Sequence, residues 1–191
     1  SMYKKLCAIL MIIVVGNGAC VAETPDSYFL GPGDKISIIV FGEEDLSIEQ
    51  LNIDVSESFE YPYLGKINTK NKSLSSLQNE IIKGLKGDYL VSPKVNISIV
   101  SYRNVYVNGV VNKPGAFEYQ PGLTVEKSIA LAGGFISKYR RTSGIYITPE
   151  GKYKGLNESE LSEILKDQEE ASLNDQVGPG DTVYTVSSLW R

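Results

Sequence analysis

The stretch that decides the fold is Gly31-Pro32-Gly33-Asp34, followed by Lys35-Ile36-Ser37-Ile38-Ile39-Val40-Phe41. Proline fixes φ for a turn, glycine supplies a positive φ, and aspartate can hydrogen-bond its own backbone to finish the turn. The apolar, β-branched residues that follow predict a strand over 35–41. The same tetrapeptide returns as Gly178-Pro179-Gly180-Asp181 before Thr182-Val183-Tyr184-Thr185-Val186, which predicts a second such strand. The recurrence near both ends indicates two related corners at which a strand begins.

Between the two corners the hydrophobic periodicity changes several times. Leucine and isoleucine recur at helical spacing at positions 74, 77, 81 and 85, which predicts a helix over 73–90 capped by Ser73 or Ser75. Alternation predicts strands over 94–102, 104–111 and 143–149. Thr124 is expected to cap a short helix over 125–131 that ends at two glycines, and a charged helix is expected over 158–170. These elements predict an α+β protein with modules over 23–103 and 104–191.

The composition narrows the possible chemistry. The chain has 191 residues, a formal net charge of −4, two cysteines and no histidine. Without histidine a single chain cannot build a Ser-His-Asp triad, a Cys-His pair or a His-ligated metal site. Nucleic-acid binding needs clustered lysine and arginine, which this acidic sequence lacks. We therefore expect no enzyme activity, no metal or cofactor and no nucleic-acid partner.

Residues 1–22 have the features of a secretory signal peptide. Lys4 and Lys5 precede an apolar run over 6–15, and small residues follow up to Ala22. Ten apolar residues are too few to span a bilayer, which takes about 20. Cleavage after Ala22 would remove both cysteines, so no disulfide is expected. The alternative is a lipoprotein in which Cys20 carries the lipid.

Five motifs resemble those of a known family. Residues 28–36, Tyr-Phe-Leu-Gly-Pro-Gly-Asp-Lys-Ile, resemble the opening of the bacterial polysaccharide export (Wza-type) domain. The segment 61–67, Tyr-Pro-Tyr-Leu-Gly-Lys-Ile, resembles that domain's Pro-x-x-Gly strand, and 92–97 resembles its closing strand. Downstream, 105–115 resembles the start of a soluble-ligand-binding β-grasp (SLBB) domain, and 128–134 and the second Gly-Pro-Gly-Asp continue that pattern.

The resemblance implies an export domain with a small mixed sheet and a helix, followed by a β-grasp-like SLBB domain. It also implies a periplasmic, homo-oligomeric conduit for capsule or exopolysaccharide, with an inner-membrane polysaccharide co-polymerase as partner. Larger family members add SLBB domains and a C-terminal amphipathic helix that crosses the outer membrane. Here the sequence stops ten residues after Asp181. We therefore expect a short member that works with a separate outer-membrane protein, with its own association with that membrane left open.

One position departs from the family's pattern. Ser56-Glu57 stand where the family usually has Asp-Gly before the strand proline, at Pro62. This departure puts the local turn in doubt, because Asp-Gly favours tight turns.

Tyr61 and Tyr63 are the candidates for contact with the polymer, because tyrosine offers a sugar both an apolar ring and a polar tip. Residues i and i+2 of a strand share a face, so both side chains are expected to point the same way. We hypothesise that Tyr61 or Tyr63 lines the lumen of the conduit. The alternative is that both pack against the helix over 73–90.

Several carboxylates are further candidates for a binding or catalytic role. Asp34 and Asp181 could bind sugar or metal, but turn closure is the favoured interpretation of both. Glu43-Glu44-Asp45 and Glu169-Glu170 could supply paired carboxylates for glycoside hydrolysis, which needs two carboxyl groups facing each other across a cleft. The function that the family resemblance implies is an export conduit. A monomeric periplasmic glycan-binding module and a carboxylate-based glycan hydrolase are the alternatives.

Overall fold

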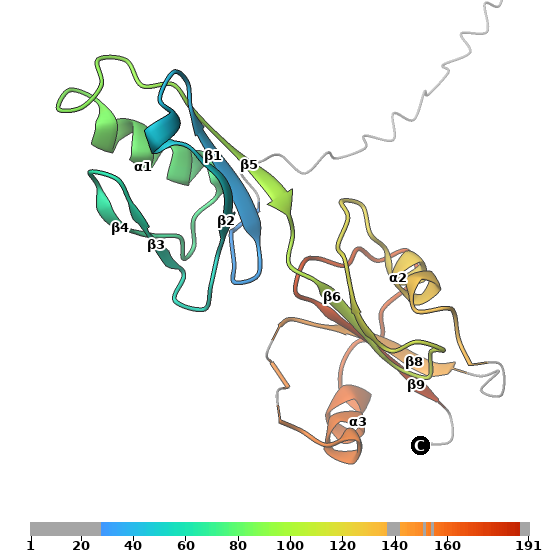
Figure 1. Cartoon of the computed structure of the whole chain (residues 1–191). Coiled ribbons are helices and arrows are strands. Elements are labelled where there is room, and N and C mark those ends of the chain that lie inside the picture. The colour runs from blue at the N-terminus through green and yellow to red at the C-terminus, as the bar shows by residue number, and fades with distance from the viewer. Residues whose placement is uncertain (1–27, 137–141, 151, 154, 188–191) are drawn as a thin grey trace, which may run out of the picture.

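The computed structural model describes residues 28–136, 142–150, 152–153 and 155–187. The leader over 1–22, with Cys20, lies outside this part of the chain. Two modules of helix and sheet lie end to end (Figure 1), and the predicted α+β class is confirmed. Only residues 102–104 separate the last strand of the first module, β5 (Val95–Ser101), from the first strand of the second, β6 (Val105–Gly109). Within the described residues, no helix is both long and apolar enough to cross a membrane.

The first module is an antiparallel sheet with a hairpin and one helix. Strand β1 (Lys35–Val40) lies between β2 (Ile48–Asn52) and β5 and pairs with both in antiparallel fashion. Strands β3 (Ser58–Tyr61) and β4 (Gly65–Asn68) form a separate hairpin. The prediction of a mixed sheet for this module is therefore wrong, because its paired strands are antiparallel. The link from β1 to β2 is short, with only the 3-10 helix η1 (Glu44–Leu46), and parallel strands need a crossover of about a dozen residues or more.

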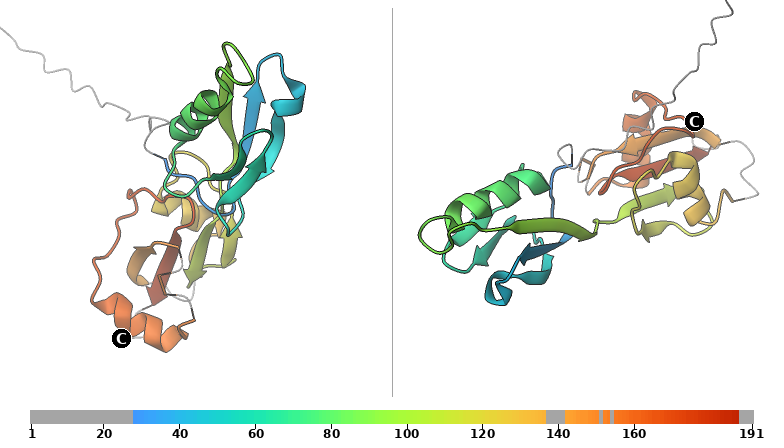
Figure 2. Two further views of the ribbon diagram at one scale, coloured as in Figure 1. Left: turned by 90° about the vertical axis from the view of Figure 1, so that its left-hand side faces the viewer. Right: turned by 90° about the horizontal axis from the view of Figure 1, so that it is seen from above.

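Helix α1 (Leu74–Leu85) packs against the sheet of this module (Figure 2). Its cap is Ser73, one of the two predicted residues, whose Oγ accepts a backbone N–H of the first turn at 3.2 Å. The helix stops well before the predicted end at 90. The chain reverses at Gly87, where φ is +95°, and the N–H of Leu90 returns to the carbonyl of Leu85 at 2.9 Å. Glycine takes this left-handed conformation without a steric penalty, so the turn overrides the helical spacing.

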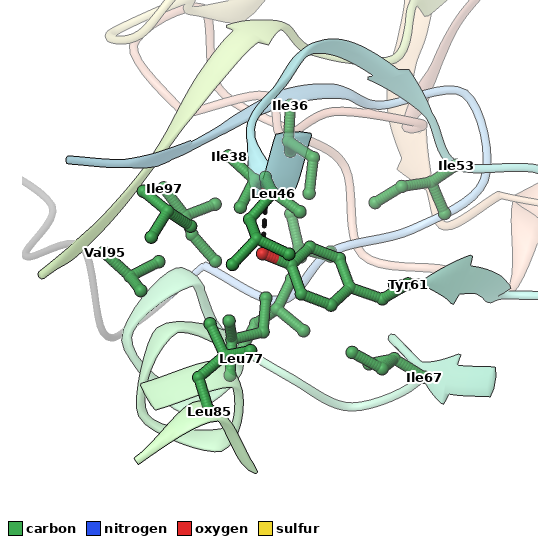
Figure 3. Close-up of a cluster of buried hydrophobic side chains, with 13 residues drawn as sticks. Ile36, Ile38, Leu46, Ile53, Tyr61, Ile67, Leu77, Leu85, Val95 and Ile97 are labelled. Atoms are coloured by element: carbon green, nitrogen blue, oxygen red, sulfur yellow. Dashed lines mark hydrogen bonds between the residues drawn. The ribbon is translucent and has the colours of Figure 1, made fainter. Parts of the chain in front are cut away.

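Side chains from the strands and from α1 meet in one hydrophobic core (Figure 3). Ile36, Ile38 and Val40 are buried at alternate positions of β1, as the alternation predicts. Leu77 and Leu85 are fully buried on the inner face of α1. Burying one such side chain stabilises the fold by about 1.5–3 kcal/mol. This apolar stripe holds the helix against the sheet.

The turn before β3 forms despite its departure from the family pattern. Glu57 adopts a φ of +51°, a conformation that glycine adopts more readily. The carboxylate of Asp54 accepts the N–H of Ser56 at 2.8 Å and orders the turn from within. The position at which the family pattern has glycine thus has a left-handed backbone in this protein, although glutamate occupies it.

The second module is a four-stranded sheet with two helices. Its strand order is β7 (Gly115–Phe117), β6, β9 (Thr182–Ser187) and β8 (Thr142–Thr148). The first and last strands, β6 and β9, are parallel neighbours in the centre, whereas both outer pairs are antiparallel. A central parallel pair formed by the first and last strands is consistent with the expected β-grasp-like domain.

The two helices of this module use opposite faces of the sheet. Helix α2 (Val125–Leu131) shares a hydrophobic core with Val107 and Val183. Helix α3 (Glu158–Lys166) instead borders a cavity together with Tyr184, whose side chain leaves β9 on the face opposite to Val183. As predicted, Thr124 caps α2. The cap of α3 is a reciprocal pair between Asn157 and Glu160, which was not predicted from the sequence.

Candidate functional site

The two Gly-Pro-Gly-Asp segments are closed turns. In the first, a carboxylate oxygen of Asp34 accepts the N–H of Gly31 at 2.9 Å. In the second, a carboxylate oxygen of Asp181 accepts the N–H of Gly178 at 2.8 Å. Each aspartate thus closes its own turn directly before a strand begins, which is the turn interpretation favoured from the sequence. Burial raises the pKa of the Asp181 carboxyl, and nearby Arg103 partly offsets that rise.

The two turns converge on Arg103, which lies in the segment that joins the modules. A β-carbon added at Gly31 would stand 2.9 Å from Arg103 Nη1, and one at Gly33 would stand 3.0 Å from Arg103 Cβ. In the second turn, a β-carbon at Gly180 would stand 2.8 Å from Arg103 Nε. A side chain at any of these three glycines would therefore displace the arginine that lies against both turns. Turns about 150 residues apart in the sequence share one side chain.

Asp34 lies at the centre of the contacts between the two turns and Arg103, which we call the junction. Its side chain is fully buried, and one oxygen accepts the Tyr28 hydroxyl at 2.6 Å and Arg103 Nη1 at 3.1 Å, besides the N–H of its own turn. The other oxygen accepts the backbone N–H of Arg103 at 2.8 Å. Arg103 Nε also lies 3.4 Å from a carboxylate oxygen of Glu150 in the second module. Burial and the neighbouring Asp34 carboxylate raise the pKa of the Tyr28 hydroxyl.

Aromatic rings and backbone hydrogen bonds extend the junction. The ring of Tyr28 meets that of Tyr102 edge to face at 5.2 Å, and Tyr102 meets Tyr119 of the second module in the same way at 5.0 Å. The second turn is fixed to the start of its own module, where the N–H of Tyr106 donates to the carbonyl of Asp181 and the N–H of Gly180 donates to the carbonyl of Asn104, each at 2.9 Å. Edge-to-face pairs contribute about 0.5–1.5 kcal/mol beyond burial. The modules are therefore joined by the packed rings and by the contacts of Arg103 with Asp34 and Glu150.

The two candidate tyrosines do not share a face. Tyr61 is the last residue of β3 and is 3% exposed, and its hydroxyl donates to the carbonyl of Leu46 at 2.7 Å (Figure 3). Burial raises the pKa of this hydroxyl. Tyr63 lies in the turn that follows, with a φ of +65° and 67% exposure. The prediction of a shared face was wrong because the strand ends at Tyr61, so alternation no longer applies two residues later. Of the two candidates, Tyr63 is therefore the exposed one and Tyr61 belongs to the core.

The hydroxyl of Tyr61 is expected to stabilise the first module. Tyr61→Phe should lower the free energy of unfolding by about 1–2 kcal/mol, because it leaves the buried carbonyl of Leu46 without its donor. Chemical denaturation followed by circular dichroism measures the change. Tyr106→Phe, at a tyrosine that is 39% exposed, should stay within about 0.5 kcal/mol of the parent. Equal stability of all three proteins would contradict the role assigned to Tyr61.

Tyr63 forms an exposed platform with Tyr89. The two rings are stacked, with centroids 4.6 Å apart and planes 24° apart, and Tyr89 is 45% exposed. Tyr89 belongs to the segment between α1 and β5, which lies at the end of the first module away from the second (Figure 1). A cavity of about 330 Å³ lies beside the platform, lined by both rings and by Glu43, Asp45, Leu46, Pro62, Asp88 and Leu90. The tyrosine platform, defined as Tyr63 and Tyr89, can therefore present an aromatic surface to a sugar.

Arg103, Tyr28 and Tyr89 were not predicted from the sequence as functional residues. No local pattern marks Arg103, since its partners come from turns on either side of the sequence. Tyr89 falls inside the helix predicted over 73–90, and the early end of α1 releases it to meet Tyr63. Of the three, only Tyr28 could have been identified from the sequence, because it is the first residue of the motif over 28–36.

Comparison with known families assigns both modules. Residues 22–100 match the family model described as polysaccharide biosynthesis/export protein, and residues 104–153 match the SLBB domain. The chain carries a polysaccharide export domain followed by an SLBB domain. The resemblance stated from the five motifs is confirmed, in the same order along the chain.

Two curated relatives carry names that denote the same process. The chain is 29% identical over 195 residues to the exopolysaccharide production protein ExoF of Rhizobium meliloti (strain 1021), which covers 94% of this chain and 45% of that protein. It is 25% identical over 151 residues to the EPS I polysaccharide export outer membrane protein EpsA of Ralstonia nicotianae, which covers 65% of this chain and 39% of that protein. The chain thus spans less than half the length of these relatives. Neither the families nor the names denote an enzyme.

Proposed function

We propose that this protein is a periplasmic component of a machine that exports capsule or exopolysaccharide. The observation that carries the proposal is the ordered pair of export and SLBB domains over 22–153. The protein would form, or contribute to, a homo-oligomeric conduit through which the polymer slides. Its partners would be an inner-membrane co-polymerase and a separate outer-membrane protein. EpsA is named an outer membrane protein, which supports a position next to that membrane.

A conduit of this kind needs many weak contacts rather than one tight site. A polymer that must move would stall in deep pockets, whereas a closed ring repeats one shallow contact by symmetry. The tyrosine platform is suited to that role because it is exposed and held by stacking. The contacts of Arg103 with both modules would then help to hold the platform in place in each subunit.

Deletion of the gene tests the proposed function. Surface polysaccharide should be lost, while polymer or its precursors accumulate inside the cell, because the exit step is missing. Restoring the gene should restore surface polymer. Normal surface polymer in the deletion strain would overturn the proposal. The mass of the purified protein with the periplasmic domain of the co-polymerase tests the ring, since a strict monomer under those conditions favours a glycan-binding module.

Removal of the exposed ring tests the role of Tyr63. Tyr63→Asn should markedly reduce surface polymer in the complemented strain, because it deletes the aromatic surface. Asparagine tolerates the positive φ at this position, and loss of the stack should cost only about 0.5–1.5 kcal/mol of stability. Tyr63→Phe keeps the ring and should export normally. If Tyr63→Asn exports as well as Tyr63→Phe while both proteins are folded, Tyr63 does not contact the polymer.

A further inference from the structure

The charged residues that line the cavity beside the tyrosine platform are all acidic. Three of its lining residues, Glu43, Asp45 and Asp88, carry carboxylates, and none of its lining residues is a lysine or arginine. Glu44 and Glu49 line an adjoining cavity together with Glu43 and Asp45, so the negative surface continues beyond the platform. A ligand at Tyr63 and Tyr89 therefore meets negative charge from one side.

These carboxylates are free to accept hydrogen bonds from a ligand. Within the described residues, neither Glu43, Asp45 nor Asp88 forms an ion pair. Other acidic side chains do have cationic partners: Glu80 pairs with Lys72, and Glu163 with Lys166. An ionised carboxylate is an acceptor only, so it favours hydroxyl or ammonium donors and repels another carboxylate.

The part of the chain that the structure describes contains no group of three acidic, cysteine or histidine residues placed to hold a metal ion. The carboxylates instead border a cavity of about 330 Å³ that also has an aromatic wall. Such a combination suits an extended ligand with an apolar face and several donor groups.

We infer that the platform and its cavity select sugar units that carry no acid group, and that an amino sugar with a free, protonated amine binds best. This inference rests on the proposed function and specifies the class of polymer. An aromatic ring packs on the apolar face of a pyranose, and Tyr63 is held in place beforehand by its stack with Tyr89. The carboxylates then accept hydroxyl or ammonium protons, whereas an acidic sugar would bring like charges together.

Titration with three hexasaccharides tests the inference. The probes are a glucosamine hexamer, maltohexaose and a galacturonic acid hexamer, added to the protein at up to about 10 mM and at about pH 5.5. NMR signals of the Tyr63 and Tyr89 rings report binding at the platform. We expect the glucosamine hexamer to bind most tightly and the galacturonic acid hexamer on the order of tenfold or more below maltohexaose.

A matched pair of triple variants separates the local effect from overall charge. Glu43→Gln with Asp45→Asn and Asp88→Asn neutralises the cavity. Glu118→Gln with Glu126→Gln and Glu169→Gln removes the same charge from exposed positions of the second module. The first triple variant should bring the three affinities to within a few-fold of one another, while the second should preserve their order.

Three results would overturn the inference: tightest binding of the acidic hexamer, equal effects of the two triple variants, or no binding of any probe at the platform. In each case the gene-deletion experiment still decides the proposed function by itself. Loss of export in the deletion strain together with any of these results would mean that the protein acts in export while its platform does not select the polymer by charge.

Discussion

Replacing Asp34 with alanine should lower the free energy of unfolding by about 3–5 kcal/mol, the largest loss we expect from a single polar residue in this protein. The carboxylate is fully buried and accepts hydrogen bonds from Tyr28, Gly31 and Arg103, including the backbone N–H of Arg103. Its removal takes away the buried ion-pair partner of the Arg103 guanidinium and leaves the more exposed Glu150 carboxylate at 3.4 Å. Urea denaturation of the parent and the variant measures the loss.

The second aspartate provides the control. Asp181→Ala removes the equivalent turn-closing bond to Gly178, but the Asp181 side chain lies outside the Arg103 hydrogen-bond network around Asp34. We expect a loss of only about 1 kcal/mol, the usual net value of one hydrogen bond. If the two alanine variants prove equally stable, the junction is not organised around Asp34.

The same variant should also loosen the arrangement of the modules. Asp34 lies in the first module and Glu150 in the second, and Arg103 links the two carboxylates. Without Asp34, small-angle X-ray scattering at a denaturant-free condition should show a broader range of separations between the modules. An unchanged scattering curve would show that the aromatic contacts of Tyr102 suffice to hold the junction.

Gly109→Ala should have a comparable effect through steric overlap. A β-carbon at Gly109 would stand 1.9 Å from the carbonyl oxygen of Thr185 and 2.7 Å from its hydroxyl, and the φ of Gly109 is +100°. The neighbour is backbone in the centre of the sheet, paired with β6, and cannot rotate away. We expect the variant to open the parallel pair and to cost more than about 3 kcal/mol, as overpacking and strain add together.

Gly122→Ala separates the effect of steric overlap from that of backbone strain. Gly122 has a φ of +82°, but no heavy atom lies within 4 Å of its hypothetical β-carbon. This variant should cost about 1–2 kcal/mol from backbone strain alone. Denaturation followed by the ring signals of Tyr184 in the second module should show a clear difference between the two variants. Equal losses would mean that β9 can move aside at Thr185.

The junction has a consequence for assembly. A ring holds its lumen open only if each subunit keeps its shape, and here both modules are tied to one arginine by hydrogen bonds and ion pairs. A rigid subunit loses less conformational freedom on association, which favours oligomer formation. The fixed junction therefore agrees with the proposed conduit.

The sequence by itself determined the features that depend on neighbouring residues. The two Gly-Pro-Gly-Asp turns, the strand after each and the caps Ser73 and Thr124 all lie where they were predicted. Turn closure, capping and alternation act over two to four residues, so the local sequence is sufficient to specify them. The family motifs predicted the order of the two modules along the chain.

Only the tertiary structure decided the site. Tyr61 and Tyr63 are two residues apart, yet one is buried in the core and the other stacks on Tyr89, because a turn begins between them. Arg103 gathers two turns that lie far from each other in the sequence. Such contacts depend on how segments that are distant in sequence pack against each other. The periodicity of a single segment contains no information about that packing.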